Sequence, residues 1–355
     1  MLTRDLSHFG TALFFAALSV MPAMAAPSKV ESREIRSTNF AQSKIGTTPV
    51  RRMAVYLPPG YDDSSTRYPV IYFFPDAFSD FREPFDHKGA QALFDRAIAD
   101  GMIGKFILVA VDMDTSLGSS WCVNSPATGN WEDFVMQELK PYVDTNFRTL
   151  PKRESQGVAG EFMGGYCAIR FGMRHPDVFG SVYALHPVGT GSGIKVMDSL
   201  PNWELMANAK SLEDVRKDGY SHIFTSIFQA HLPDPDKPPL YIDMPAHKVG
   251  DRLIIDTLLT QRLRENFFLE SMIPPYAENL KSLRGFKFDW GRSDLNQDHV
   301  YSNQAFTHKL NEFGIPHEAE EYNGVWGDKT WGDDGRIYNE VLPFFKKHLL
   351  FDESH

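Results

Sequence analysis

The sequence predicts an α/β fold with a doubly wound, mostly parallel sheet, helices on both faces and a helical lid insertion. Short apolar runs typical of strands buried on both faces occur at residues 69–74, 105–111 and 181–185. Segments with helical spacing lie between them, at residues 90–99 and 131–139. This alternation predicts parallel strands joined by helices, with ligands at the carboxyl ends of the strands.

The remaining elements extend this pattern in chain order. Residues 52–57 have strand character, and strands are expected again at residues 285–290 and 317–322, with a closing helix at residues 337–349. Between residues 189 and 283 the segments become longer, helical and broken by proline-rich loops. We expect this stretch to form an insertion over the sheet that acts as a lid. The expected single domain covers residues 45–350, after an N-terminal extension at residues 26–44.

The first 25 residues predict a signal peptide. An arginine at position 4 precedes an apolar run from Phe9 to Met21, followed by Ala-Met-Ala at residues 23–25. Cleavage is expected after Ala25, which predicts a periplasmic or secreted protein. The apolar run is too short to span a bilayer, and no later segment has the roughly 20 apolar residues that a span needs.

Charge and composition exclude some classes of partner. The chain has 46 acidic and 36 basic residues, a net charge of −10, so a broad basic surface for nucleic acid is not expected. The only two cysteines, Cys122 and Cys167, could pair in an oxidising compartment, although a domain of this size does not need a disulfide. Composition leaves the oligomeric state open.

Residues 156–176 have the form of a nucleophile elbow, with Phe162 where the attacking residue should stand. Residues 158–159 can end a buried strand, Gly160 and Gly164 permit a tight turn, and a helical pattern follows. The pattern therefore predicts the frame of a serine hydrolase and contradicts its chemistry, because phenylalanine offers no nucleophile.

Further segments carry a recognisable pattern, at residues 56–61, 68–72, 123–133 and 175–180. Together with the elbow, they resemble the esterase D and feruloyl esterase family of α/β-hydrolases, a family that also includes secreted mycolyltransferases. The resemblance spans about residues 45–350 and implies the α/β-hydrolase fold.

The resemblance implies Asp294 as the acid of a catalytic triad, since it follows the strand expected at residues 285–290. The other two triad positions depart from the family pattern. Phe162 replaces the serine of Gly-x-Ser-Met-Gly-Gly, and Trp326 replaces the histidine of Tyr-x-Gly-x-His. Pro-Asp at residues 75–76 stands where the family usually has His-Gly beside the oxyanion hole. Ordinary Ser-His-Asp ester hydrolysis is therefore not expected.

The replacements predict a different pocket on the same frame. We expect Asp76, Glu161 and Asp294 to act as catalytic carboxyl groups. The residues expected to contact substrate are Phe162, Trp326, Met163, Trp121 and His186. Aromatic faces would suit a small hydrophobic or aromatic molecule. The carboxylates match no recognised ligand code, so neither a metal nor a cofactor is expected.

Other interpretations of single residues remain open. Asp76 and Glu161 could face solvent or pair with nearby arginines. His186 and His299 could approach the site near Asp294, or they could be surface or capping histidines. Cys167 lies too far along the helix to act as a nucleophile from the turn.

Three functions follow from the sequence. The first is an enzyme with serine-independent acid/base chemistry on a small hydrophobic or aromatic substrate. The second is a pseudoenzyme that binds a ligand or a partner. The third is a carboxylic ester hydrolase that uses residues outside the family pattern.

Overall fold

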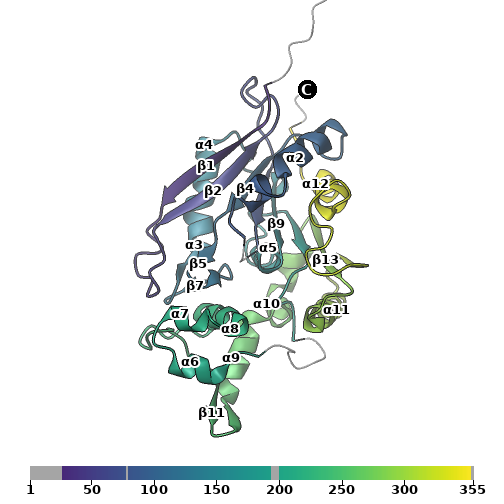
Figure 1. Ribbon diagram of the computed structural model, residues 1–355. Coiled ribbons are helices and arrows are strands. Elements are labelled where there is room, and N and C mark those ends of the chain that lie inside the picture. Colours follow the sequence, from purple (N-terminus) through teal and green to yellow (C-terminus); the bar gives the residue numbers. More distant parts are fainter. Residues whose placement is uncertain (1–25, 77–78, 193–199, 353–355) are drawn as a thin grey trace, which may run out of the picture.

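The computed structural model describes residues 26–76, 79–192 and 200–352. The signal peptide expected at residues 1–25 lies outside the described residues. The predicted α/β class is confirmed, because one eight-stranded and mostly parallel sheet carries helices on both faces (Figure 1).

The strands of the central sheet follow the spatial order β1-β2-β4-β3-β9-β10-β13-β14. Their bounds are β1 Lys29–Arg36, β2 Val50–Leu57, β3 Val70–Phe74, β4 Ile107–Val111, β9 Gln156–Glu161, β10 Ser181–Leu185, β13 Gly285–Gly291 and β14 Glu318–Tyr322. β1 and β2 pair antiparallel, as do β2 and β4. All pairs from β4 to β14 are parallel, so the carboxyl ends of six strands meet at one edge of the sheet.

Three two-stranded ladders lie outside this sheet. They are β5 Asp114–Thr115 with β6 Gly118–Ser119, β7 Asn124–Ser125 with β8 Gly129–Asn130, and β11 Ala246–Val249 with β12 Arg252–Ile255.

Helices cover the two faces of the sheet unequally. Those of the domain frame are α1 Glu83–Asp86, α2 Ala90–Ala99, α3 Trp131–Asp133, the π-helical η1 Phe134–Leu139, α4 Lys140–Asn146, the 3-10 turn η2 Arg153–Ser155, α5 Met163–Arg174, α11 Gln297–Glu312, the π-helical η3 Ile337–Val341 and α12 Leu342–His348. Side chains of α2, η3 and α12 form the core on one face. Side chains of α3, α4, α5 and α11 belong to the larger core on the other.

The central strands are buried for the reason that the sequence indicated. Every residue of β3, β4 and β10 is buried, as expected for strands covered on both faces. The edge strand β1 was missed, and it begins the sheet inside the stretch that we expected to be an N-terminal extension. Its charged and half-exposed residues are typical of a protected sheet edge, and for that reason they did not stand out as strand.

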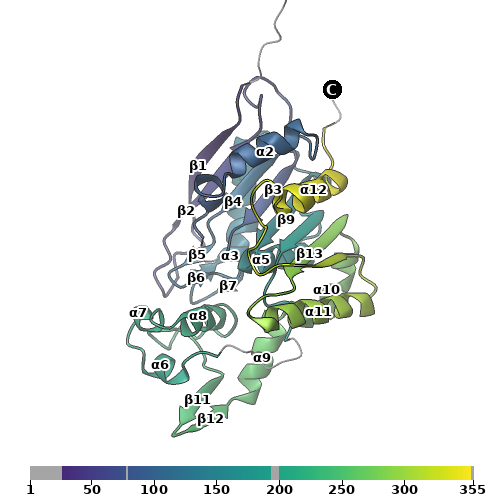
Figure 2. The same ribbon diagram turned by 45° about the vertical axis from the view of Figure 1, so that its right-hand side comes forward.

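The segment expected as an insertion contains its own helices and one hairpin. Its helices are α6 Trp203–Asn208, α7 Leu212–Val215, α8 Gly219–His231, α9 Thr257–Phe267 and α10 Leu269–Lys281. α6 to α9 and the β11–β12 hairpin lie to one side of the sheet, beyond the carboxyl ends of its parallel strands (Figure 2). The division of the chain into domain and insertion stays a prediction.

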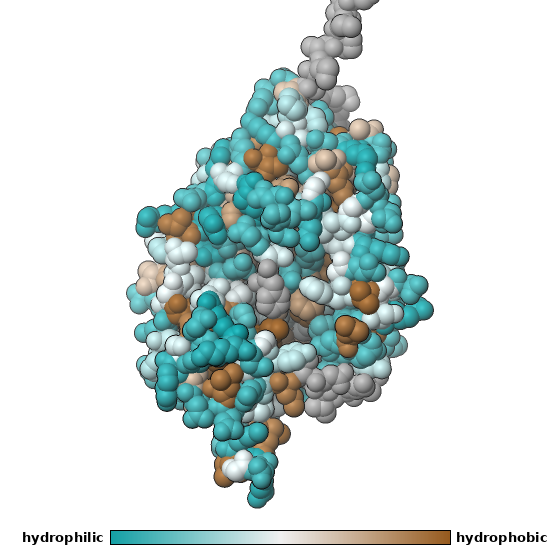
Figure 3. Space-filling view, in the orientation of Figure 1, coloured by the Kyte–Doolittle hydropathy of each residue, from teal (hydrophilic) through white to brown (hydrophobic). Residues whose placement is uncertain are grey.

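The surface is hydrophilic over most of the face seen in Figure 3. Val249 and Ile255, on the projecting hairpin, are each 59% exposed. Across residues 26–76, 79–192 and 200–352, no helix combines the length and apolar character needed to cross a membrane.

Cys122 and Cys167 form a disulfide, which settles the pairing that the sequence left open. The bond joins the loop before β7 to α5, the helix that follows the elbow. Trp121 and Cys122 have left-handed backbone angles, with φ of 54° and 55°. The disulfide therefore anchors this loop, and Trp121 with it, next to the elbow helix.

Candidate functional site

The elbow has the predicted strand–turn–helix geometry. Phe162 stands between β9 and α5 with φ 55° and ψ −110°, a conformation that costs a non-glycine residue on the order of 1–3 kcal/mol. Gly160 and Gly164 allow the turn to be this tight, because a Cβ on Gly164 would overlap the carbonyl oxygen of Phe74. A strained backbone that exposes a nucleophile in serine hydrolases here presents a phenyl ring.

Phe162 packs against three rings at the carboxyl edge of the sheet. Its ring centre lies 4.6 Å from that of Trp326, 5.2 Å from that of His299 and 6.4 Å from that of His186. The residues at the family's serine and histidine positions, Phe162 and Trp326, are thus in contact. The two positions that are predicted to have lost a triad residue therefore lie side by side.

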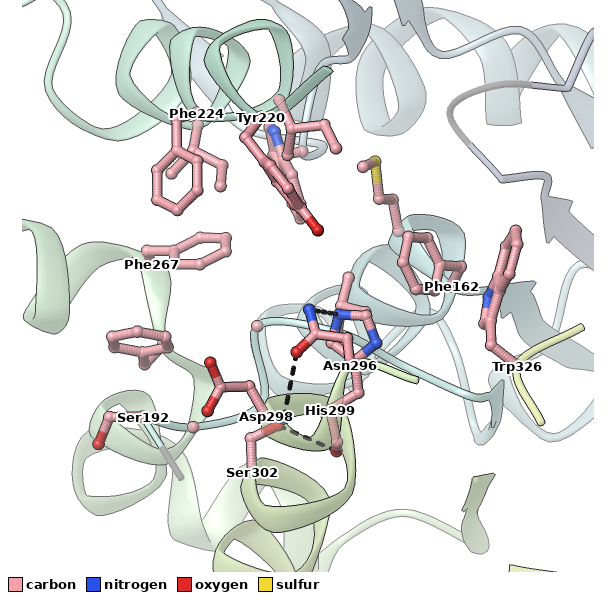
Figure 4. Close-up of a pocket in the computed structure, with 18 residues that line it drawn as sticks. Phe162, Ser192, Tyr220, Phe224, Phe267, Asn296, Asp298, His299, Ser302 and Trp326 are labelled. Atoms are coloured by element: carbon pink, nitrogen blue, oxygen red, sulfur yellow. Dashed lines mark hydrogen bonds between the residues drawn. The ribbon is translucent and has the colours of Figure 1, made fainter. Parts of the chain in front are cut away.

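Phe162, Trp326 and His299 form one wall of a partly open cavity of about 320 Å³, which we call the elbow pocket (Figure 4). Aromatic and aliphatic side chains from the insertion form the opposite wall, among them Phe224, Ile227 and Phe267. Most polar groups of the pocket gather around the start of α11, at Asn296, Asp298, His299 and Ser302, while Tyr220 and Ser192 lie apart from them. The cavity is therefore apolar with one polar corner, a common form for small-molecule sites.

Asp294 lies behind this polar corner and holds two histidines. Its Oδ2 is 2.7 Å from His186 Nε2 and 2.8 Å from His299 Nδ1, and its Oδ1 accepts the Asn296 backbone N–H at 2.9 Å. Burial acts to raise the pKa of Asp294, but the hydrogen bonds from His186 and His299 outweigh it and hold that pKa well below its usual range. Asp294 is therefore an ionised acceptor between two imidazoles.

The partners on the far side of each ring assign the imidazole protons. His186 Nδ1 accepts the Gly291 backbone N–H at 3.0 Å, and His299 Nε2 lies 3.2 Å from the Asn296 amide nitrogen. The Asn296 oxygen accepts the Asp298 N–H, so its NH₂ faces His299. Neutral rings with these partners carry their protons on the nitrogens that face Asp294.

His186 is deeply buried, and burial lowers its pKa, although Asp294 partly opposes this effect. Because its Nδ1 accepts the Gly291 N–H, the ring is a neutral imidazole. His186 supports the pocket from behind, since it contacts Phe162 but does not line the cavity.

The same three groups have the spacing of a metal site. Ligand atoms of His186, Asp294 and His299 lie within 4.8 Å of one another. Metal-bound histidines donate their other N–H to an acceptor, whereas both rings here face donors on that side. The donor set therefore suits shared protons better than a metal ion.

The two other predicted carboxyl groups do not line the elbow pocket. Asp76 is buried, and Glu161 is half-buried at the end of β9. Burial, and secondly the negative charge of Asp76, raise the pKa of Glu161 to about 7. Glu161 is the last residue of β9 and Phe162 stands in the turn that follows, and of the two only Phe162 lines the elbow pocket. Their assignment as catalytic groups stays a prediction.

Most of the residues predicted to contact substrate line the elbow pocket, but not all of them do. Phe162, Met163, Trp121 and Trp326 all line the elbow pocket, whereas His186 and Asp294 lie behind it. His299 was named only as a neighbour of Asp294, and it is the group that joins Asp294 to the cavity. A sequence pattern could have identified it. His299 ends the Asn-x-x-His pattern of residues 296–299, which begins a helix directly after Asp294.

Comparison with known proteins supports an esterase-family frame. The family described as "Putative esterase" matches residues 47–231. Esterase Rv1288 of Mycobacterium tuberculosis is 27% identical over 292 residues, covering 80% of this chain and 54% of that protein. An endo-1,4-beta-xylanase/feruloyl esterase of Xylanibacter ruminicola is 27% identical over 185 residues, 49% of this chain and 25% of that protein. The chain thus spans about half the length of the first relative, and less of the second.

Solved structures share the fold. A ferulic acid esterase aligns with a TM-score of 0.64 at 20% identity, covering 92% of this chain and 100% of that one. An S-formylglutathione hydrolase from Agrobacterium tumefaciens aligns with a TM-score of 0.60 at 12% identity, covering 93% and 99%. These likenesses place the elbow and the strand that leads to Asp294 in an α/β-hydrolase frame.

Proposed function

This chain belongs to the esterase family of α/β-hydrolases, and we propose that it performs serine-independent acid/base chemistry on a small hydrophobic or aromatic molecule. The observation that carries the proposal is the pair His299–Asp294 at the polar corner of the elbow pocket. A carboxylate on Nδ1 directs Nε2 toward proton exchange, as for the histidine of a catalytic triad, once a substrate or water molecule displaces the Asn296 amide that Nε2 now faces.

In this proposal His299 replaces the family histidine from a different element. It comes from α11, whereas the family position, Trp326, follows β14 and now contributes an apolar wall. His299 Nε2 takes a proton from the substrate or from a water molecule directed at it. The positive charge that develops on the ring is balanced by Asp294, which stays ionised, while neutral His186 donates to the same oxygen.

One donor for a developing negative charge is available at the elbow. Met163 is the first residue of α5, and the first N–H groups of a helix have no partner within it. Met163 also lines the elbow pocket. Its backbone N–H is therefore suited to stabilise an oxyanion or enolate formed next to Phe162.

The walls define the class of substrate. Phe162, Trp326, Trp121 and Phe267 offer ring faces, and the volume of about 320 Å³ suits a molecule built around one aromatic ring. The printed names of two relatives include feruloyl or ferulic acid esterase. Methyl ferulate is accordingly a reasonable first probe for this pocket.

The test measures conversion of methyl ferulate and p-nitrophenyl acetate in the wild type and in H299N, D294N and H308N. His308 is an exposed histidine on the same helix and provides the matched control. Turnover should fall by at least roughly 100-fold in H299N and D294N and stay unchanged in H308N. Full activity of H299N would remove His299 from the mechanism. Labelling of the wild type by a fluorophosphonate would instead indicate an active serine.

A ligand-binding role without turnover is the second candidate. It is favoured by the contact between Phe162 and Trp326, which fills both lost triad positions with packed rings. In that case methyl ferulate would raise the melting temperature and be recovered unchanged after long incubation. Recovery of a chemically changed product would instead show that the protein is an enzyme.

We also propose that the protein is exported. The proposal rests on the basic, apolar and small-residue pattern of residues 1–25, and the Cys122–Cys167 disulfide is compatible with an oxidising compartment. N-terminal sequencing of the protein recovered outside the cytoplasm should begin at Ala26. Recovery of uncleaved protein only from the cytoplasm would contradict export.

A further inference from the structure

A second cavity lies on the far side of one wall of the elbow pocket. It has a volume of about 400 Å³ and is bordered by α5, the end of α8, α9 and α10. Phe267 lines the elbow pocket, and its ring centre lies 5.1 Å from that of His231, which lines the second cavity. We call this second cavity the arginine pocket, because Arg170, Arg174 and Arg262 border it.

Two of these arginines share one buried carboxylate. Arg170 and Arg174 are one turn apart on α5, and both lie near Glu132, whose side chain is 9% exposed. Glu132 accepts hydrogen bonds from Arg174 Nε at 2.7 Å and from His175 Nε2 at 2.8 Å. Its distance to Arg170 Nη2 is 3.5 Å, at the limit of a hydrogen bond. The carboxylate is thus committed to Arg174 and His175.

Arg170 is left with few partners for a buried cation. Its side chain is only 12% exposed, its Nε has no hydrogen-bond partner within the described parts of the chain, and its Nη1 contacts the weak acceptor Met272 Sδ at 3.4 Å. A guanidinium carries five N–H donors and is costly to bury without acceptors. Arg170 therefore has donor capacity for one more acceptor.

His231 also borders this cavity. It is 4% exposed, and its Nε2 has no hydrogen-bond partner among residues 26–76, 79–192 and 200–352. Burial lowers the pKa of His231 well below its usual value, and the charge of Arg170 lowers it further. A neutral imidazole therefore borders the cavity next to Arg170 and adds no second positive charge to it.

The balance of charge limits the ligand to a monoanion. Three arginines border the cavity, and the carboxylates near them are Glu132 and Glu265. One net positive charge remains, and a dianion such as phosphate would meet the repulsion of both glutamates. A planar monoanion with two acceptors matches the fork of a guanidinium.

We propose that the arginine pocket binds the carboxylate of a small organic acid, with the Arg170 guanidinium as its principal donor. The site is separate from the elbow pocket and does not depend on the function proposed for it. Its volume leaves room for a short chain beyond the carboxylate, which would lie toward Met272 and Pro275.

The test is calorimetric titration of the full-length mature protein with sodium butyrate, inorganic phosphate and sodium chloride at matched ionic strength. Butyrate should bind saturably with a dissociation constant of about 1 mM. R170Q should weaken binding by at least roughly tenfold, and R170K should weaken it to a smaller degree, since lysine keeps the charge and loses the fork. K281Q makes the same change of charge on an exposed site of α10 and should bind as the wild type does.

Several outcomes would overturn the proposal. These are equal butyrate affinity in the wild type and R170Q, wild-type affinity in R170K, and the absence of saturable binding up to roughly 50 mM. Phosphate binding as tight as butyrate binding would overturn the assignment to a carboxylate. If circular dichroism shows that R170Q does not fold, R170K and the wild type decide the question.

Discussion

The elbow pocket and the arginine pocket share the wall formed by Phe267 and His231, yet their buried polar groups differ in how completely they are hydrogen-bonded. Asp294, which is predicted as the triad acid, lies next to the elbow pocket and has hydrogen bonds on both oxygens. In the arginine pocket, Arg170 and His231 have buried nitrogen atoms with no partner in the described residues. The elbow can thus keep its charge without a ligand, whereas the arginine pocket gains most from an anion.

The largest expected effect concerns the ability of the His299–Asp294 pair to activate a nucleophile. F162S places a hydroxyl on the elbow beside His299, whose ring now lies 5.2 Å from the phenyl ring. Labelling by a fluorophosphonate should rise from none to near stoichiometric, measured by intact mass, while F162A stays unlabelled. If only F162S/W326H is labelled, His299 does not replace the family histidine.

The next prediction compares the contributions to stability of two tryptophans that line the elbow pocket, Trp121 and Trp326. Trp121 is 1% exposed, packs edge-on against Tyr166 and Phe267, and donates from Nε1 to Ser226 at 3.0 Å. W121A should lower the free energy of unfolding by about 3–5 kcal/mol, because it opens a cavity in the core.

W326A is the matched control for this comparison, since Trp326 is 41% exposed. Its loss should cost less than about 1 kcal/mol. Urea unfolding measures both variants. Equal losses of unfolding free energy would contradict the conclusion that Trp121 belongs to the core and Trp326 to the exposed part of the pocket wall.

A smaller effect tests the carboxylate of the arginine pocket. Burial acts to raise the pKa of Glu132, but hydrogen bonds from His175 and Arg174 lower it overall to about 2. Its contribution to stability is present above pH 4.5 and is lost as the pH falls toward 2. E132Q should cost about 2–3 kcal/mol at pH 7 and much less at low pH.

Urea unfolding at pH 7 and pH 3 measures the difference. E278Q, at an exposed position of α10, should change stability by less than about 0.5 kcal/mol at either pH. An equal loss for E132Q at both pH values would show that its effect is not electrostatic.

The smallest effect concerns Glu161, which precedes Phe162 but does not line the elbow pocket. Because its pKa is raised from 4.5 to about 7, the wild type should lose stability as the pH rises through that range. E161Q removes this loss and should be more stable than the wild type by about 1–2 kcal/mol at pH 8. The same variant tests the prediction that Glu161 is catalytic, because wild-type conversion of methyl ferulate by E161Q would remove Glu161 from the catalytic groups and abolished conversion would support it.

Much of the fold could be predicted because it depends on local patterns. The buried strands β3, β4 and β10 are apolar runs, and the glycines of the elbow are required wherever a strand turns tightly into a helix. The edge strand β1 could not be recognised in this way, because its charged residues resemble a loop and become a strand only through pairing with β2.

The sequence by itself determined the α/β frame, the position of the elbow and the presence of Phe162 at its turn, since motif spacing and residue type decide these. Only the tertiary structure decided which side chains share a cavity. It joined Phe162, Trp326 and His299 from three distant segments, and it brought Arg170 and His231 together behind Phe267. The physical reason is that strand alternation and helix packing set the direction of each side chain, and neither can be read from spacing along the chain.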